Sequence, residues 1–459
     1  AFFHSFWCYS VSGCLNFGMA RSFDFANGDF EKGDGQVKLT KASDASPATV
    51  GASMSQSIFN LVKNIVGSGV LSLPAGLAAG TGVIPALMLS IILGSISAYC
   101  FSLVGRVCDK TGKKTFKDLG EATSGSRFAY SMAVVCTLKT FMTCLSYSIV
   151  LSDSFSSILR GCSVPDEYST PNTVLLYIMA LIVMPMCLMK DLSLLSYTSL
   201  AGISGMLYTT VFVTIRCFDG TYEPGGLYYN TAKFKPDFGS GTNTWTINIK
   251  TLVLLCALST AFIAHYNAPK FYCELRDRSI RRFNFVVAIA FGIALLIFMC
   301  VMLAGYFTFG RNAQGLILNN YSDDDILATL ARACVGLSTI CTYPLAFTGL
   351  RDGSLSLLGL GSGDVAFYSV TATFLILITI LAWFIDSLGF VNNFGGAVFG
   401  ASIIYIFPSM LFLLAAGKGL AMCTWERPLT RLLIGLGAFL VFLGSVVATL
   451  EEYYPAALG

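Results

Sequence analysis

The sequence predicts an all-α membrane protein with eleven transmembrane helices. Of its 459 residues, 55% are hydrophobic and only 12% are charged, and the mean hydropathy is +0.70. This composition excludes an ordinary soluble domain. Apolar runs of about 20 residues, the length that crosses a bilayer, recur along the chain. The runs are centred near Gly67, Ile92, Thr143, Met179, Met206, Ile263, Ala294, Thr339, Ile376, Ile403 and Phe439.

Basic residues predict the orientation of these spans. Lys and Arg gather in alternate loops, for example from Arg106 to Lys117 and from Arg276 to Arg282. Cytosolic loops of membrane proteins are enriched in these residues. We therefore expect a multi-pass integral protein whose N-terminus and basic loops face the cytosol. The plasma membrane and a vacuolar or lysosomal membrane both fit this pattern.

Composition and span order divide the chain into five expected segments. The N-terminal segment is rich in Gly, Ser, Asp and Lys and poor in apolar residues, so we expect a disordered cytosolic tail. No cleavable targeting sequence is evident in it, and Met19 is a candidate start of translation. The segments are the tail (1–54), a first five-helix repeat (55–216), an outer loop (217–248), a second five-helix repeat (249–416), and an eleventh helix with the C-terminus (417–459).

The first span is expected to break at its centre. The stretch from Asn64 to Pro74 reads NIVGSGVLSLP, with Gly67 and Gly69 on either side of Ser68. Broken helices at membrane depth are tolerated where they line a cavity, and in secondary transporters they hold the substrate and the coupling ion. Free N–H groups there bind a carboxylate and free carbonyls bind a cation. A small-residue packing face is the alternative, but its glycines are normally four positions apart.

The sixth span is expected to be the second interrupted helix. The stretch from Ala257 to Leu275 reads ALSTAFIAHYNAPKFYCEL and includes Ser259, Thr260 and Pro269. Polar and helix-breaking residues crowd a span that otherwise requires apolar ones. Its place five spans after the first is what two inverted five-helix repeats predict.

Two lysines, Lys63 and Lys139, lie at membrane depth. An unpaired ammonium there costs about 3 kcal/mol, so each lysine is expected to face the bundle interior or a cavity. In that position it replaces a coupling cation by its charge or binds an anionic group of the substrate. The alternative is that the side chain extends toward the inner interface, and the sequence slightly favours this alternative for Lys139.

The eighth span carries hydroxyl groups at mid-membrane. Ser338 and Thr342 are suited to complete an oxygen cage around Na⁺ together with carbonyls of the first span. The alternative is that each hydroxyl bonds to its own helical turn.

Among fifteen cysteines, Cys162 and Cys217 fall just beyond the outer ends of the third and fifth spans. An oxidising compartment would allow a disulfide between them, and two free thiols are the alternative.

Nothing in the chain indicates an enzyme. It contains no phosphate-binding loop of the GxxxxGK(S/T) type and no GxSxG elbow, and its Cys and His residues are not grouped at metal-ligand spacing. We expect no cofactor other than Na⁺ as a candidate coupling ion.

Several motifs resemble the amino acid/auxin permease family, which includes sodium-coupled neutral and proton-coupled amino acid transporters. They occur in the same order as in that family and extend the resemblance from about Ser55 to Leu450. The motifs are NLVKNIVGSGVLSLP (Asn60 to Pro74), STAFIAHYNAPKFYCEL (Ser259 to Leu275), GYFTFG (Gly305 to Gly310), TYPLAFTGLR (Thr342 to Arg351) and GGAVFGASIIYIFPSMLFL (Gly395 to Leu413).

The resemblance implies the leucine-transporter-type fold and transport of amino acids by alternating access. It places the substrate carboxylate on backbone N–H groups of Ser68, Gly69 and Val70, next to Gly67. The substrate ammonium would meet carbonyls and hydroxyls around Ser259 and Thr260. A sodium ion would lie on the carbonyls of Lys63 and Val66 and the hydroxyl of Thr342, with Ser338 close by. The implied partners are a small-molecule amino acid and membrane lipid, and no nucleic acid.

Two ions, H⁺ and Na⁺, are candidates for the coupling ion. A lysine at the position of Lys63 resembles the proton-coupled members, whereas Thr342 favours sodium, and the balance is slightly toward protons. A different class of function is a transporter-like amino acid sensor that signals through the cytosolic tail. Within transport, export from a vesicle or vacuole fits the sequence as well as uptake across the plasma membrane.

Overall fold

The computed structural model describes residues 51–189, 199–239, 241–360 and 363–458. Apart from two isolated β-bridges, the regular structure within these ranges is helical. Its first half comprises α2 (Met54–Ile65), η1 (Ser68–Ser72), α3 (Leu73–Ala78), α4 (Val83–Thr111), α5 (Phe116–Ser124), α6 (Ser126–Gly161), α7 (Asp166–Ser169), α8 (Pro171–Ile178), η2 (Met179–Val183), α9 (Met184–Leu188) and α10 (Ser199–Phe218).

The second half begins with another divided helix. It comprises α11 (Thr251–Ala261), η4 (His265–Asn267), α12 (Ala268–Glu274), α13 (Ile280–Phe309), η5 (Ile317–Asn320), α14 (Ile326–Leu358), α15 (Asp364–Phe384), α16 (Leu388–Gly395), η6 (Gly396–Gly400), η7 (Ser402–Ile406), α17 (Phe407–Gly417), α18 (Glu426–Phe439), η8 (Leu440–Gly444), α19 (Ser445–Tyr453) and η9 (Pro455–Leu458).

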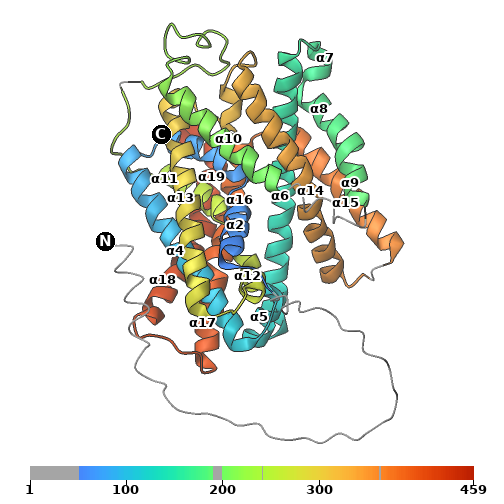
Figure 1. Cartoon of the computed structure of the whole chain (residues 1–459), viewed down its shortest axis with the longest axis vertical. Coiled ribbons are helices and arrows are strands. Elements are labelled where there is room, and N and C mark those ends of the chain that lie inside the picture. The colour runs from blue at the N-terminus through green and yellow to red at the C-terminus, as the bar shows by residue number, and fades with distance from the viewer. Residues whose placement is uncertain (1–50, 190–198, 240, 361–362, 459) are drawn as a thin grey trace, which may run out of the picture.

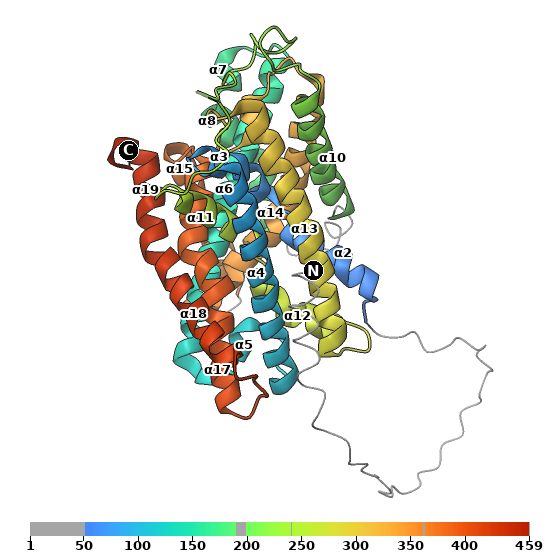
Figure 2. The same ribbon diagram turned by 90° about the vertical axis from the view of Figure 1, so that its left-hand side faces the viewer.

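The helices form one elongated bundle in which α4, α6, α13 and α14 run along most of its length (Figures 1 and 2). In the described ranges, nine helices are long and apolar enough to cross a membrane, and the bent pair from Met54 to Ala78 makes ten. The helix α10 contributes only a shorter apolar stretch, Gly202–Phe218. The all-α membrane fold is therefore confirmed, whereas the expected count of eleven spans is not.

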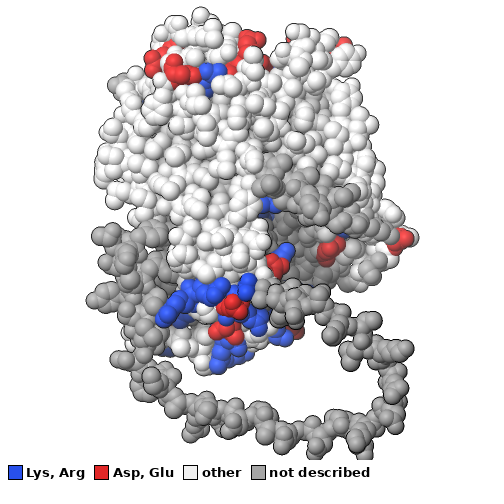
Figure 3. Space-filling view, in the orientation of Figure 1, with Lys and Arg blue, Asp and Glu red and all other residues white. Residues whose placement is uncertain are grey.

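A largely uncharged band crosses the middle of the bundle on the face that Figure 3 shows. Figure 3 shows this band between two charged ends, with Lys and Arg gathered at the end where α5, α12 and α17 lie. The helix α13 is the most apolar of the spanning helices in the described ranges. A surface of this kind is stable only against hydrocarbon, as expected for a multi-pass membrane protein.

Close packing of α4 on α13 depends on a small residue. A Cβ atom at Gly105 would lie 2.3 Å from the Phe283 ring, so only glycine fits there. The Phe283 ring in turn stacks on Phe101 at a centroid distance of 5.7 Å, and Phe101 contacts Phe291 at 5.5 Å. These aromatic contacts hold α4 and α13 beside the second broken helix.

The first span breaks where the sequence predicts. The helix α2 begins at a capping box formed by Ser53 and Gln56. It ends at Val66, with ψ near 92°, and Gly67 continues in extended backbone with φ −123° and ψ −169°. The chain then re-enters a helix from Ser68 to Ala78, bent by 45° from the first half. Neither glycine of the break adopts a positive φ, so the break does not depend on left-handed backbone.

The sixth span is also interrupted. The helix α11 ends at Ala261, and Phe262 and Ala264 leave helical geometry before the short turn η4 and the helix α12. Pro269 lies in the first turn of α12, where its missing N–H costs no hydrogen bond. Both predicted broken helices are thus confirmed.

Most of the expected N-terminal tail lies outside the residues that the structure describes. Residues 1–50 lie outside the described ranges, but Ala52 is held in a parallel β-bridge to Leu275. The Ala52 N–H donates to the Glu274 carbonyl at 2.8 Å, and the Arg276 N–H donates to the Ala52 carbonyl at 3.0 Å. Backbone pairing to the segment after α12 therefore holds the chain just before α2.

Cys162 and Cys217 are free cysteines, so the candidate disulfide is wrong. The helices that carry them, α6 and α10, both pack against α14. Beside Cys162, Arg160 binds Asp323 at 3.0 Å, and beside Cys217, Arg216 binds Asp325 at 2.7 Å. The two helix ends are therefore held by separate carboxylates at the start of α14 rather than by each other.

Asp323 lies close to three basic side chains, those of Arg160, Lys233 and Arg332. Burial acts to raise the pKa of Asp323, but the hydrogen bond from Arg160 and the charge of Lys233 outweigh it and keep the pKa below its usual value. The carboxylate therefore stays ionised and keeps its ion pairs.

Candidate functional site

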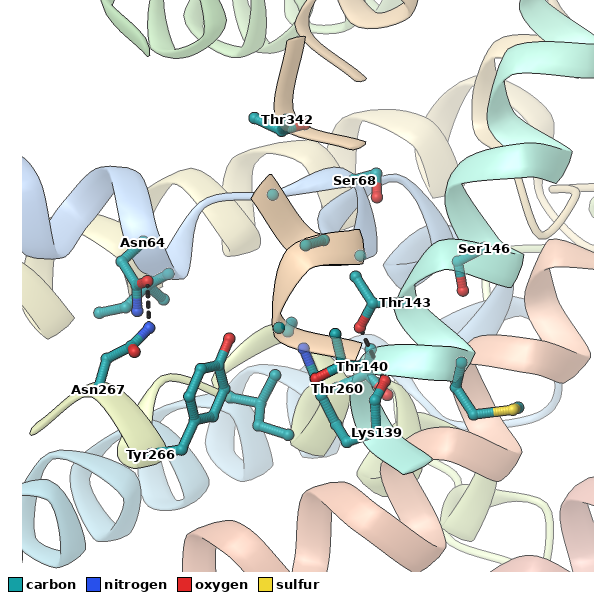
Figure 4. Close-up of a pocket in the computed structure, with 18 of the residues that line it drawn as sticks. Asn64, Ser68, Lys139, Thr140, Thr143, Ser146, Thr260, Tyr266, Asn267 and Thr342 are labelled. Atoms are coloured by element: carbon teal, nitrogen blue, oxygen red, sulfur yellow. Dashed lines mark hydrogen bonds between the residues drawn. The ribbon is translucent and has the colours of Figure 1, made fainter. Parts of the chain in front are cut away.

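A cavity of about 680 Å³ lies between the two broken helices. Its walls come from α2 and η1, from α11 and α12, and from α6, α14 and α16. Figure 4 shows side chains from these elements facing a common space. Six of the ten residues predicted for substrate and ion binding line it, namely Lys63, Gly67, Ser68, Gly69, Thr260 and Thr342.

The break in the first span presents free backbone N–H groups to this cavity. The Val70 N–H makes the first bond of the new helix, to the Gly67 carbonyl at 3.2 Å. The N–H groups of Ser68 and Gly69 precede that bond, and the first N–H groups of a helix have no partner within it. Ser68 and Gly69 therefore offer the donors, whereas the Val70 N–H already has a backbone partner.

Thr260 and Ser259 are neighbours with different surroundings. The Thr260 hydroxyl lines the cavity and donates to the Asn392 carbonyl. The Ser259 hydroxyl donates to the Leu255 carbonyl at 2.9 Å and contacts Tyr405, and Gly400 packs against its backbone. The Ser259 side chain is therefore buried against η6 and does not line the cavity, unlike that of Thr260.

The two broken helices are joined by a pair of amides. The Asn267 Nδ2 donates to the Asn64 Oδ1 at 2.9 Å, which links η4 to the last turn of α2 (Figure 4). Both asparagines line the cavity. They belong to the predicted motifs, but their contact could not be predicted from two segments that are about 200 residues apart.

Both lysines at membrane depth line the cavity. The Lys139 ammonium lies 5.4 Å from the centre of the Tyr266 ring. The slight preference for Lys139 extending to the inner interface is therefore wrong, because Tyr266 holds its ammonium at the cavity wall. Lys63, one turn before the break, has no carboxylate within ion-pair distance among the described residues.

The residues predicted for sodium binding separate into two groups. The Thr342 hydroxyl lines the cavity, donates to the carbonyl of Ser338 at 2.9 Å and also hydrogen-bonds to the Tyr147 side chain. The Ser338 hydroxyl lies against α10, 2.8 Å from where a Cβ of Gly202 would be. Ser338 therefore faces a neighbouring helix and does not line the cavity. Val66 is buried and does not line the cavity.

Asn392 is a residue that the sequence analysis missed. Its Nδ2 donates to Ser72 Oγ at 3.2 Å, and its Oδ1 accepts from Ser146 Oγ at 3.1 Å. Its carbonyl accepts from Thr260, so one residue connects α16 to η1, α6 and α11. The signal that could have indicated it is the pair Asn392 and Asn393 in an otherwise apolar span.

We expect Asn392→Ala to destabilise the protein by about 1–3 kcal/mol, because Ser72 and Ser146 would lose a buried partner. Thermal unfolding in detergent measures the change. Asn393→Ala is the matched control, since the neighbouring amide makes no side-chain hydrogen bond within the described residues. Equal unfolding temperatures for the two variants would show that the Asn392 network contributes nothing.

The cavity reaches the surface at the basic end of the bundle. Lys270 and Glu274 on α12 belong to its lining, and their side chains are 69% and 55% exposed. This is the end at which α5, α12 and α17 lie in Figure 2. The cavity is therefore accessible from one end of the molecule.

His265 and the acidic residues do not form a metal site. The buried His265 ring bonds to the Ser97 carbonyl at 2.9 Å and contacts Phe101, which is a structural role. Within the described ranges, no group of three or more His, Cys, Asp or Glu could hold a metal ion. The polar groups that line the cavity are amides, hydroxyls, ammonium groups and the carboxylate of Glu274, and groups of this kind bind small polar molecules.

Comparison with known sequences identifies similar proteins over nearly the whole chain. The family model described as "Transmembrane amino acid transporter protein" matches residues 50–450. Amino acid transporter AVT6E of Arabidopsis thaliana is 23% identical, over 91% of this chain and 86% of the relative. Sodium-coupled neutral amino acid symporter 2 of Danio rerio is 24% identical, over 89% of this chain and 84% of the relative.

Two solved structures share the fold. MhsT in complex with L-phenylalanine matches with a TM-score of 0.52 and 12% identity, over 85% of this chain and 98% of that chain. The inward facing conformation of Mhp1 matches with a TM-score of 0.56 and 12% identity, over 91% of this chain and 94% of that chain. At this level of identity the likeness shows the fold alone.

Proposed function

The chain belongs to the transmembrane amino acid transporter protein family, and we propose that an amino acid binds in the cavity between its two broken helices during transport. Secondary active transport of amino acids is the activity that its relatives and its fold support. The observation that carries the proposal is the meeting of two broken helices at one cavity of about 680 Å³.

The substrate carboxylate would bind the free N–H groups of Ser68 and Gly69. These donors start the helical segment Ser68–Ala78, whose dipole also favours a negative charge. The substrate ammonium would lie toward Thr260, whose hydroxyl oxygen is fixed by its bond to Asn392. Carbonyls at the end of α11 supply further acceptors, since the last carbonyls of a helix have no partner within it.

For the coupling ion we propose a proton, with Na⁺ as the second candidate. Lys63 places an ammonium on the cavity wall one turn before the break, where it would repel a bound cation. The observation that favours Na⁺ is Thr342 on the same cavity, together with relatives described as sodium-coupled.

We propose that the basic end faces the cytosol, so the cavity as described is open inward. The basic end carries Lys and Arg between α4 and α5 and between α12 and α13, which is typical of cytosolic loops (Figure 3). The membrane concerned would be the plasma membrane or that of a vacuole or lysosome. The sensor function has no support among these relatives, which are described as transporters.

Uptake of a radiolabelled amino acid panel into proteoliposomes tests the proposal. We expect at least one amino acid to accumulate under an imposed pH gradient, and accumulation to stop when an ionophore dissipates the gradient. Liposomes without protein are the control. Folded protein that moves no amino acid under either a pH or a Na⁺ gradient would contradict transport.

A further inference from the structure

The charges inside the cavity are unbalanced. Its ionisable lysine and carboxyl groups, among the described lining residues, are Lys63, Lys139, Lys270 and Glu274. Lys270 and Glu274 lie at the exposed mouth and form an ion pair with each other at 3.9 Å. The interior therefore keeps two ammonium groups, from Lys63 and Lys139, without a carboxylate.

We propose that the preferred substrate is an acidic amino acid, and that Lys139 binds the carboxylate of its side chain. This inference rests on the function proposed above, because it assumes that the substrate occupies this cavity. An amino acid with a neutral side chain brings one carboxylate and one ammonium, and so leaves both lysines unpaired. A second carboxylate compensates one of them, which recovers part of the cost of a bare ammonium at membrane depth.

Lys139 is the better placed of the two lysines for this contact. It projects from α6 into the cavity beside Thr260, and the Tyr266 ring holds its ammonium at 5.4 Å (Figure 4). A contact with the face of a ring orients the ammonium but leaves N–H groups free to donate. Thr143, one turn further along α6, adds a hydroxyl that lines the same wall.

The distribution of donors supports two separate carboxylate sites. The N–H groups of Ser68 and Gly69 belong to the first broken helix, whereas Lys139 belongs to α6. Thr260, which is assigned to the substrate ammonium, also lines the space that these elements share in Figure 4. A molecule with two carboxylates and one ammonium matches this set in number and in sign of charge.

Competition between isosteric substrates tests the proposal. In proteoliposomes, we expect unlabelled L-glutamate or L-aspartate to inhibit the uptake of a radiolabelled amino acid more strongly than L-glutamine or L-asparagine does. Lys139→Gln should lower the preference for the acidic amino acids over their amides by about tenfold or more, because a charge-assisted contact is lost. The amides should still be carried. Lys117→Gln is the matched control, since Lys117 is exposed at the surface and bonds to Ser356.

The possible outcomes distinguish the proposal of an acidic substrate from the proposal of amino acid transport. A wild-type preference for the amides, or an unchanged ratio in Lys139→Gln, would overturn the acidic substrate and leave transport standing. Uptake of a neutral amino acid that requires chloride, with gluconate as the replacement, would show that an inorganic anion compensates the lysines and would overturn it too. If Lys139→Gln does not fold, the wild-type ratio decides. Absence of all amino acid uptake would instead contradict the proposed function.

Discussion

Gly69→Leu is expected to abolish amino acid uptake without preventing the protein from folding. A Cβ atom at Gly69 would lie 3.5 Å from Thr260 Cγ2 and 3.8 Å from Ala261 Cα, which is ordinary contact. The remaining leucine atoms must then occupy the gap between the two broken helices. They would cover the N–H groups of Ser68 and Gly69 that are proposed to bind the substrate carboxylate.

The reason for this effect is occupancy of the site rather than backbone strain. Gly67 and Gly69 both have negative φ or extended backbone, so a side chain is compatible with the conformation at either position. A Cβ at Gly67 meets no atom within 4 Å, so Gly67→Leu would extend into open cavity space. We expect Gly67→Leu to reduce uptake less than Gly69→Leu does.

Initial uptake rates in proteoliposomes measure both variants, and gel filtration in detergent verifies folding. Gly435→Leu is the matched control, because Gly435 is an exposed glycine of α18 with open space around it. We expect uptake by Gly69→Leu to fall to the level of empty liposomes and uptake by Gly435→Leu to remain normal. Normal uptake by Gly69→Leu would show that the substrate binds elsewhere.

The broken helices could be predicted because their signals are local. Gly67, Ser68 and Gly69 lower helix propensity within one turn, and Pro269 follows a cluster of polar residues in the sixth span. Such signals need no knowledge of the partner helices. The division of the chain into spans follows for the same reason, since apolar length is read along the sequence.

Which side chain of α11 faces the cavity could not be predicted in the same way. Ser259 and Thr260 are adjacent, and α11 has no amphipathic periodicity that would mark its inner face. The choice between them is made by Gly396 and Gly400, where a Cβ would approach α11 to 2.0 Å and 3.0 Å. These glycines are more than 130 residues away in the sequence.

Contacts between distant elements also explain the other differences between these expectations and the structure. Ser338 was predicted from its hydroxyl alone, but the position of α10 turns it away from the cavity. The pairing of Cys162 with Cys217 was plausible from their shared side of the membrane, but α14 supplies separate carboxylates to the two helix ends. Asn392 was missed because its three partners come from three different helical elements.

Lys63→Ser is expected to uncouple uptake from the proton gradient. If the Lys63 ammonium performs the electrostatic role of a bound cation, its removal leaves the oxygen atoms near the break without a positive charge. Uptake driven by a pH gradient should then fall strongly. A Na⁺ dependence should appear instead, because the Thr342 hydroxyl lines the same cavity and can accept a cation.

Thr342→Ala distinguishes proton coupling from sodium coupling in the wild type. If Na⁺ drives the wild type, Thr342→Ala should raise the Na⁺ concentration needed for half-maximal uptake. Ser338→Ala is the matched control, because Ser338 lies on the same helix but faces α10. Under proton coupling, wild-type uptake should follow an imposed pH gradient and be the same with or without Na⁺.

Initial rates under each gradient alone, in the wild type and the three variants, distinguish the two ions. Wild-type uptake that follows Na⁺ and ignores the pH gradient would contradict proton coupling and would assign Lys63 to the substrate or to the cavity wall. Proton-driven uptake that survives in Lys63→Ser would contradict its role as a substitute cation. A shift from proton to Na⁺ dependence in this single variant would instead show that a fixed ammonium and a bound cation fulfil the same electrostatic requirement beside the broken helix.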